Sequence, residues 1–164
     1  MGKIFGKRRA ETIQPDPEPV IEEPPAQPRL RIAIVDDDDD VRELLGLGLT
    51  TDTLEVVGTA ADATRAVRLV EEQQPDIVLL DLHMPDMGGL EVLPVLRDKC
   101  PNARVVAFSA IGATHMVENA LEAGVFGYIE KGVSIDSIIK HLDRVSTAGR
   151  VKFVRPFPLR RDYA

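Results

Sequence analysis

The stretch DIVLLDLHMPDMGG, residues 76–89, decides the fold. A short run of Ile, Val and Leu ends at a carboxylate, Asp81, and a proline and two glycines follow within eight residues. Consecutive apolar residues without polar alternation are typical of a parallel strand that is buried on both faces. Pro85 and Gly88 disfavour regular structure directly after it. The stretch therefore predicts a buried strand whose carboxyl end presents Asp81 in a loop.

The same pattern recurs on both sides of this stretch. Short runs rich in Val, Ile or Leu predict five strands, at residues 31–35, 55–59, 76–80, 104–108 and 126–129. Between and after them, apolar residues recur every three or four positions, which indicates amphipathic helices. These residues are Val41, Leu44, Leu45 and Leu49; Ala63, Ala66, Val67 and Val70; Leu90, Leu93 and Leu96; Val117 and Leu121; and Ile135, Ile138, Ile139 and Leu142. Ser134 is a candidate start of the last helix and Gly124 a candidate end of the fourth. Five strands alternating with five helices predict an α/β fold, with a parallel sheet covered on both faces.

Composition divides the chain into three parts. Residues 10–29 contain six prolines and five acidic side chains with almost nothing apolar, so we expect residues 1–29 to be a disordered tail. Residues 30–149 contain all the predicted strands and helices and form the expected domain. Residues 150–164 hold five basic side chains and one acidic side chain, which predicts a basic C-terminal tail.

Charge, cysteine content and hydropathy restrict the class of function. Residues 32–149 hold nine basic and 21 acidic side chains, and a domain this acidic repels nucleic acid and suits a cation site. Cys100 is the only cysteine in the sequence, which excludes an intrachain disulfide and fits a reducing compartment. No apolar run approaches the roughly 18 residues that span a bilayer, and residues 1–9 lack the apolar segment of a secretory signal. We therefore expect a cytoplasmic protein.

Polar side chains follow four of the predicted strands. Asp36 and Asp37 follow the first strand, Asp81 the third, Ser109 the fourth and Lys131 the fifth. The carboxyl ends of parallel strands meet at one edge of the sheet, where ligands bind. Clustered carboxylates repel one another without a counter-charge, and Mg²⁺ prefers oxygen ligands. The cluster therefore predicts a magnesium site that can also hold a phosphoryl group.

In such a site Asp81 is the candidate nucleophile, because a carboxylate can form an acyl phosphate. Lys131 would balance the phosphoryl charge, and the Ser109 hydroxyl would donate to a phosphoryl oxygen. The run of acids continues through residues 38–40. We expect these side chains to cap the first helix, where negative charge is stabilised by the positive end of the helix dipole, and not to bind the metal.

With these residues in place, the chain resembles the receiver domain of two-component response regulators. The resemblance covers about residues 30–149, and residues 120–124, ALEAG, are similar to the subfamily that usually carries a DNA-binding helix-turn-helix. The matching motifs are Val35-Asp36-Asp37 with Arg42 downstream, Asp81-Leu82-His83-Met84-Pro85 with Gly88-Gly89, Phe108-Ser109-Ala110, and Gly127-Tyr128-Ile129-Glu130-Lys131.

The resemblance implies a flavodoxin-like fold with strand order 2-1-3-4-5 and a role for each site residue. Asp81 would accept the phosphoryl group from a sensor histidine kinase or a phosphotransfer protein. The implied metal ligands are Asp36, Asp37, Asp81 and the backbone carbonyl of His83. Ser109 and Lys131 would hold the phosphoryl group. Tyr128 would be an aromatic switch that turns inward when Ser109 moves.

Two side chains are expected to set the lifetime of the phosphorylated form. The resemblance implies that the side chains of His83 and Ile111 flank the path of the attacking water. Because Ile111 is apolar, we predict a phosphorylated lifetime longer than seconds. His115 and His141 have no metal-ligand spacing to His83, so we do not expect its ring to bind metal.

The expected output is a changed contact with another protein, which the sequence does not identify. The segment after residue 149 is too short for a DNA-reading module and contains Pro156 and Pro158, so we expect a stand-alone receiver without direct DNA binding. Phosphorylation adds charge at a buried site and would bias a surface around the fourth helix, the fifth strand and the fifth helix. The basic residues of both tails could contact a membrane or nucleic acid, or simply remain solvated.

Two other interpretations remain open at this point. Aspartate-nucleophile phosphatases carry Asp-x-Asp after a strand, but the residue two positions after Asp81 is His83, and the chain is short for a substrate-binding cap. A non-phosphorylated binding scaffold of the same fold usually lacks an acidic residue or the lysine, and none is missing here. We therefore expect a phosphorylation-controlled switch rather than an enzyme with an external substrate.

Overall fold

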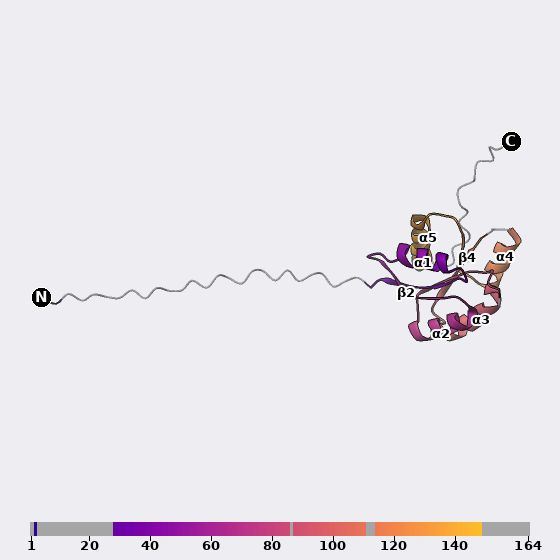
Figure 1. Ribbon diagram of the computed structural model, residues 1–164, viewed down its shortest axis with the longest axis horizontal. Helices are drawn as coiled ribbons and strands as arrows, with labels where there is room; N and C mark the ends of the chain where they lie inside the picture. The colour runs from indigo at the N-terminus through magenta and orange to yellow at the C-terminus, as the bar shows by residue number, and fades with distance from the viewer. Residues whose placement is uncertain (1, 3–27, 86, 111–113, 149–164) are drawn as a thin grey trace, which may run out of the picture.

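A computed structural model describes residues 2, 28–85, 87–110 and 114–148 (Figure 1). Strands and helices alternate along the described chain as the sequence predicts. They are β1 (Leu30–Val35), α1 (Asp39–Gly48), β2 (Leu54–Ala60), α2 (Ala63–Gln73), β3 (Ile77–Leu80), α3 (Gly89–Lys99), β4 (Arg104–Ser109), α4 (Thr114–Ala123), β5 (Gly127–Glu130) and α5 (Ile135–Ala148). The strands pair in parallel in the order β2-β1-β3-β4-β5, which confirms the predicted flavodoxin-like fold. Ile111, the C-terminal tail and nearly all of the N-terminal tail lie outside the described residues.

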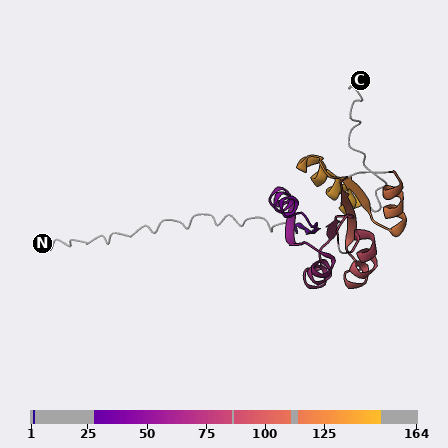
Figure 2. The same ribbon diagram turned by 45° about the vertical axis from the view of Figure 1, so that its right-hand side comes forward.

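Helices cover both faces of the sheet and enclose one apolar cluster on each. In Figures 1 and 2, α1 and α5 lie on one side of the strands and α2 and α3 on the other. The first cluster joins Leu45 of α1 and Leu142 of α5 to the sheet, and the second joins Val70 of α2, Leu93 of α3 and Ala120 of α4. Burial of aliphatic side chains on both faces is the main stabilising contribution in a domain with so few aromatic residues.

The helix ends carry specific polar caps. Asp38 is the N-cap of α1, and its carboxylate accepts hydrogen bonds from the amides of Asp40 and Val41. The predicted cap of α5 is also present, because the Ser134 hydroxyl accepts from the Ser137 amide. As predicted, Gly124 stops α4, which ends at Ala123, and its φ of +99° lies in the left-handed region that favours glycine.

Three arginines cap the carboxyl ends of three helices. Each guanidinium donates to two backbone carbonyls of a last turn or of the residue after it, which satisfies acceptors that have no partner within the helix. Arg31 donates to Gln73 and Gln74 after α2, Arg97 to Ala123 and Gly124 after α4, and Arg104 to Val145 and Ser146 in α5. These helices run antiparallel to the strands, so the three caps lie at the amino edge of the sheet.

One predicted core position of α1 is wrong. Leu44 is 61% exposed, as is its neighbour Leu47 at 76%, whereas Leu45 and Leu49 are buried. At 100° per residue, Leu45 and Leu49 lie on one face of the helix and Leu44 lies about a quarter turn away. In the described part of the chain, no helix has the length and apolar character needed to cross a membrane.

His141 of α5 is buried in the domain interior against β5. Its ring lies against the backbone of Gly127, where an added Cβ would be 2.6 Å from Nε2, and neither ring nitrogen has a hydrogen-bond partner among the described residues. Burial, and secondarily the charge of Arg144, lowers the pKa of His141 below its usual 6.5. The folded domain therefore favours the neutral imidazole.

We expect this histidine to make the domain less stable in mild acid. As pH falls below about 6.5, the unfolded chain binds a proton at His141 that the folded chain excludes, so the free energy of unfolding decreases, by at most about 1.4 kcal/mol per pH unit. His141→Phe should flatten the pH dependence of the urea midpoint between pH 7 and pH 5. His115→Gln, which replaces an exposed histidine of α4, should leave it as it is. Equal slopes in the wild type and His141→Phe would contradict the assignment.

Candidate functional site

The backbone of the sheet places the predicted site residues at its carboxyl edge. The strand order reverses between β1 and β3, and the ends of these strands are where ligands bind in such folds. The parallel ladders continue one step beyond the strands: the Asp36 amide donates to Ala60, the Asp81 amide to Val35 and the Lys131 amide to Ser109. Asp36, Asp81 and Lys131 therefore leave backbone positions that are held by a neighbouring strand.

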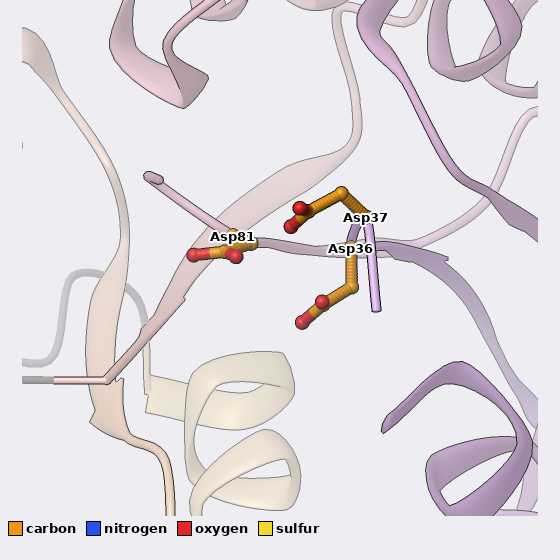
Figure 3. A group of neighbouring side chains, drawn as sticks. All are labelled: Asp36, Asp37 and Asp81. Atoms are coloured by element: carbon orange, nitrogen blue, oxygen red, sulfur yellow. The ribbon is translucent and has the colours of Figure 1, made fainter. Parts of the chain in front are cut away.

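The three acidic side chains named by the sequence lie together. Carboxylate oxygens of Asp36, Asp37 and Asp81 all lie within 4.8 Å of one another. Figure 3 shows Asp36 and Asp37 reaching from the end of β1 towards Asp81 at the end of β3. Asp36 and Asp81 are buried and Asp37 is exposed, so the cluster is open to solvent on one side. Such a set of oxygens fits a hard divalent cation that keeps some of its waters.

Lys131 provides a positive charge within this cluster. Its Nζ lies 2.7 Å from Asp36 Oδ2 and 2.9 Å from Asp81 Oδ2, and 5.7 Å from the centre of the Phe108 ring. The amide of His83 donates to the other oxygen of Asp81, at 3.0 Å. Asp36 Oδ2 is buried and has no partner at hydrogen-bonding angles, although the ammonium approaches it closely. This oxygen has remaining capacity for a metal ion.

Burial and the attraction between opposite charges shift the pKa values of Asp36 and Lys131. Burial raises the pKa of Asp36, and the neighbouring ammonium of Lys131 offsets this only in part. Burial opposes the charged form of Lys131, but the carboxylates of Asp36 and Asp81 outweigh it and raise the lysine pKa. The ammonium is therefore kept charged, while the carboxylate of Asp36 is held at a cost to stability.

Replacing Asp36 with asparagine should therefore stabilise the fold. The folded-state pKa of Asp36 lies above 3.8, so the stability associated with its protonated form is lost as pH rises through that value. Asparagine does not ionise, and we expect Asp36→Asn to raise the free energy of unfolding at pH 7 by about 1 kcal/mol. Urea denaturation without added metal measures this, with Asp98→Asn on the exposed surface of α3 as the matched control. A less stable Asp36→Asn protein would contradict the argument.

Two neighbours that hold the acidic loops were missed as site residues. Arg42 donates to the Asp36 carbonyl at 2.6 Å and pairs with Asp39, which ties the start of α1 to the end of β1. A Cβ on Gly89 would lie 2.3 Å from the Asp81 carbonyl oxygen, so only glycine allows α3 to begin so close to this loop. Both residues stood in the matching motifs, but a motif does not say which backbone atom a side chain contacts.

The hydroxyl of Ser109 is buried between two rings. His83 Nδ1 lies 2.7 Å from Ser109 Oγ, and the Ser109 side chain also hydrogen-bonds to the hydroxyl of Tyr128. Tyr128 is 1% exposed and belongs to the apolar cluster formed with α2, α3 and α4, and its burial raises its pKa. The inward position predicted for the tyrosine after Ser109 moves is thus already occupied in this structure.

Comparison with known proteins shows which family this chain resembles. A family model described as the response regulator receiver domain matches residues 32–143. The chemotaxis protein CheY of Listeria monocytogenes is 35% identical over 117 residues, which are 71% of this chain and 98% of that protein. The transcriptional regulatory protein LnrK of Bacillus subtilis is 34% identical over 123 residues, 74% of this chain but 56% of LnrK. The chain therefore spans little more than half the length of that regulator.

Solved structures agree with the sequence comparison. A LuxR-family two-component response regulator from Aurantimonas superposes with a TM-score of 0.69 at 33% identity, covering 75% of this chain and 89% of that chain. A chain of the CheX–CheY–BeF3–Mg²⁺ complex from Borrelia burgdorferi gives a TM-score of 0.66 at 30% identity, covering 71% of this chain and 88% of that chain. The resemblance to response regulator receiver domains noted in the sequence is confirmed, and a LuxR-family regulator is among the similar structures.

Proposed function

Because the chain belongs to the response regulator receiver domain family of two-component systems, we propose that it is a phosphorylation-controlled switch whose phosphoacceptor is Asp81. The observation that carries the proposal is the position of this carboxylate. It lies at the topological switch point, next to two further carboxylates and within an ion pair of Lys131. Asp36 shares these three features, and the match to the receiver motif Asp81-Leu82-His83-Met84-Pro85 assigns the acceptor role to Asp81.

The proposed reaction transfers a phosphoryl group from a histidine to Asp81. An oxygen of Asp81 attacks phosphorus, the P–N bond of the phosphohistidine breaks, and its electron pair returns to the imidazole of the donor protein. The donor is a sensor histidine kinase or a phosphotransfer protein. Lys131, already 2.9 Å from Asp81, balances charge on the phosphoryl oxygens, and the Ser109 hydroxyl donates to one of them.

Magnesium is the expected cofactor of this transfer. Asp36, Asp37 and Asp81 would hold it, and the backbone carbonyl of His83 is the fourth proposed protein ligand. The three carboxylates fit this role because their oxygens already converge and one of them, on buried Asp36, has only the ammonium of Lys131 beside it. Bound Mg²⁺ would neutralise charge on the transferring phosphoryl group.

The proposed output is a change in protein contacts. A phosphoryl group adds nearly two negative charges beside Ser109, and Ser109 is joined to Tyr128 on β5. The surface of α4, β5 and α5 is therefore where we expect the downstream protein to bind, with Tyr128 as the switch. Direct DNA binding is not part of the proposal, because the acidic domain repels nucleic acid.

Intact-protein mass spectrometry with acetyl phosphate tests the function. We expect a single phosphoryl adduct in the presence of Mg²⁺ and none after EDTA treatment, because the three carboxylates repel an anionic donor without a cation. Restoring excess Mg²⁺ should restore the adduct, and Ca²⁺ serves as a control for bulk divalent charge. Absence of any adduct, also with histidine kinases as donors, would favour the constitutive binding scaffold. Continuous turnover of a phosphate ester would favour the phosphatase.

A further inference from the structure

Three side chains connect the phosphoacceptor loop to the interior of the domain. His83 lies two residues after Asp81, Ser109 ends β4, and Tyr128 lies on β5. The His83 ring is at hydrogen-bonding distance from the Ser109 hydroxyl, at 2.7 Å, and the same side chain bonds to Tyr128. Ser109 and Tyr128 are almost completely buried, whereas His83 is exposed. The exposed ring of His83 therefore contacts the buried pair of Ser109 and Tyr128 from the solvent side.

The chemistry of a hydroxyl couples the two bonds that Ser109 makes. It has one hydrogen to donate and two lone pairs that accept. If His83 Nδ1 accepts that hydrogen, the Tyr128 hydroxyl must donate to Ser109, and if Nδ1 donates, Ser109 can donate to Tyr128. In either arrangement Ser109 has two partners, and the loss of the imidazole nitrogen removes one partner of this buried hydroxyl.

We propose that His83 is a positioning residue that holds Ser109, and through it Tyr128, in the inward arrangement before any phosphoryl group arrives. The part of this inference that concerns phosphorylation rests on the proposed function. In the unphosphorylated chain the imidazole takes the place at Ser109 that a phosphoryl oxygen would take later. The structure supports this directly, since Tyr128 is buried while Ser109 is bonded to His83.

Two consequences follow for the switch. Tyr128 is inward in a large fraction of unphosphorylated molecules, so phosphorylation changes its exposure less than it would without His83. The phosphoryl group also competes with, or shares, the bond between His83 and Ser109. A substitution at His83 therefore alters the resting state of the switch and not only its rate of phosphorylation.

Tyrosine fluorescence can report the position of Tyr128 alone. The sequence has two tyrosines and no tryptophan, so a Tyr163→Phe background leaves Tyr128 as the single emitter. Acrylamide quenching is measured without phosphodonor or Mg²⁺. His83→Ala should lower the ratio of inward to outward tyrosine about fivefold, the change expected for one hydrogen bond, and raise quenching accordingly.

Isosteric variants separate positioning from packing. Asparagine can place a polar atom near the position of Nδ1, whereas glutamine places one nearer Nε2, so His83→Asn should retain the wild-type quenching and His83→Gln should not. His115→Ala, at an exposed histidine of α4, is the matched control. In a Ser109→Ala background, His83→Ala should have no further effect, because the shared hydroxyl is gone.

The outcomes decide the inference independently of the reaction. Wild-type quenching in His83→Ala, with unchanged circular dichroism, would overturn it, and so would a wild-type Tyr128 that is quenched as readily as free tyrosine. Equal effects of His83→Ala with and without the Ser109 hydroxyl would assign the effect to packing and also overturn it. Loss of the Mg²⁺-dependent adduct would instead remove the proposed function and leave the quenching results as they are.

Discussion

Asp81→Asn is expected to abolish the phosphoryl adduct completely. The amide of asparagine is a poor nucleophile and cannot carry the negative charge that pairs with Lys131 in the wild type. Its side chain has nearly the same size, so the fold should remain intact in this buried position. Intact mass after incubation with acetyl phosphate and Mg²⁺ measures the loss, and circular dichroism checks the fold.

The matched control is Asp98→Asn, which removes a carboxylate from the exposed side of α3. It should form the adduct at the wild-type rate. If Asp81→Asn formed the adduct at the wild-type rate, the phosphoacceptor would have to be another carboxylate. Asp36 or Asp37, within 4.8 Å, would then be examined by peptide mapping.

Lys131→Met should reduce the rate of adduct formation by roughly 100-fold, the usual effect of removing one preorganised charge or donor at a reacting group. Methionine preserves an unbranched apolar side chain but removes the ammonium from Asp36, Asp81 and the Phe108 ring. The pKa of Asp36 should rise further, because Lys131 is the main group that opposes the effect of burial. Rates are measured by the time course of intact mass at saturating Mg²⁺.

Lys140→Met, at an exposed position of α5, should phosphorylate as the wild type does. An unchanged rate in Lys131→Met would show that the lysine serves only to neutralise the resting acidic cluster. A large loss in stability without a change in the rate of the folded fraction would lead to the same conclusion. Either outcome would mean that the metal and Ser109, and not Lys131, stabilise the phosphoryl group.

Much of the fold could be predicted because each buried strand is a short aliphatic run. The runs before Asp81 and Ser109 have no polar interruption, and no other element type fits them between helices of this length. Leu44 was placed on the wrong face of α1 because apolar spacing of three or four residues admits two neighbouring faces. Only the packing of α1 against the sheet and α5 decides which face is buried.

The acidic cluster could also be predicted, since the rule that strand ends meet at one edge brings Asp36, Asp37 and Asp81 together without side-chain detail. The bond between His83 and Ser109 could not. It depends on the rotamers of two side chains 26 positions apart, and a histidine after a phosphoacceptor suggests metal or water before it suggests a serine. Sequence spacing predicts which strand ends meet, but it does not predict the hydrogen bonds between the side chains at those ends.

The two edges of the sheet are held by different kinds of interaction. Arg31, Arg97 and Arg104 fasten the last turns of three helices to the rim of the sheet opposite the acidic cluster. At the acidic edge, the loops after β1 and β3 are held by Arg42, by the His83 amide and by the two ion pairs of Lys131. A charge added at Asp81 would therefore act on the ion pairs of Lys131 and leave the arginine caps at the opposite edge in place. Displacements caused by the added charge should therefore be larger at the acidic edge of the sheet than at the edge held by the arginines.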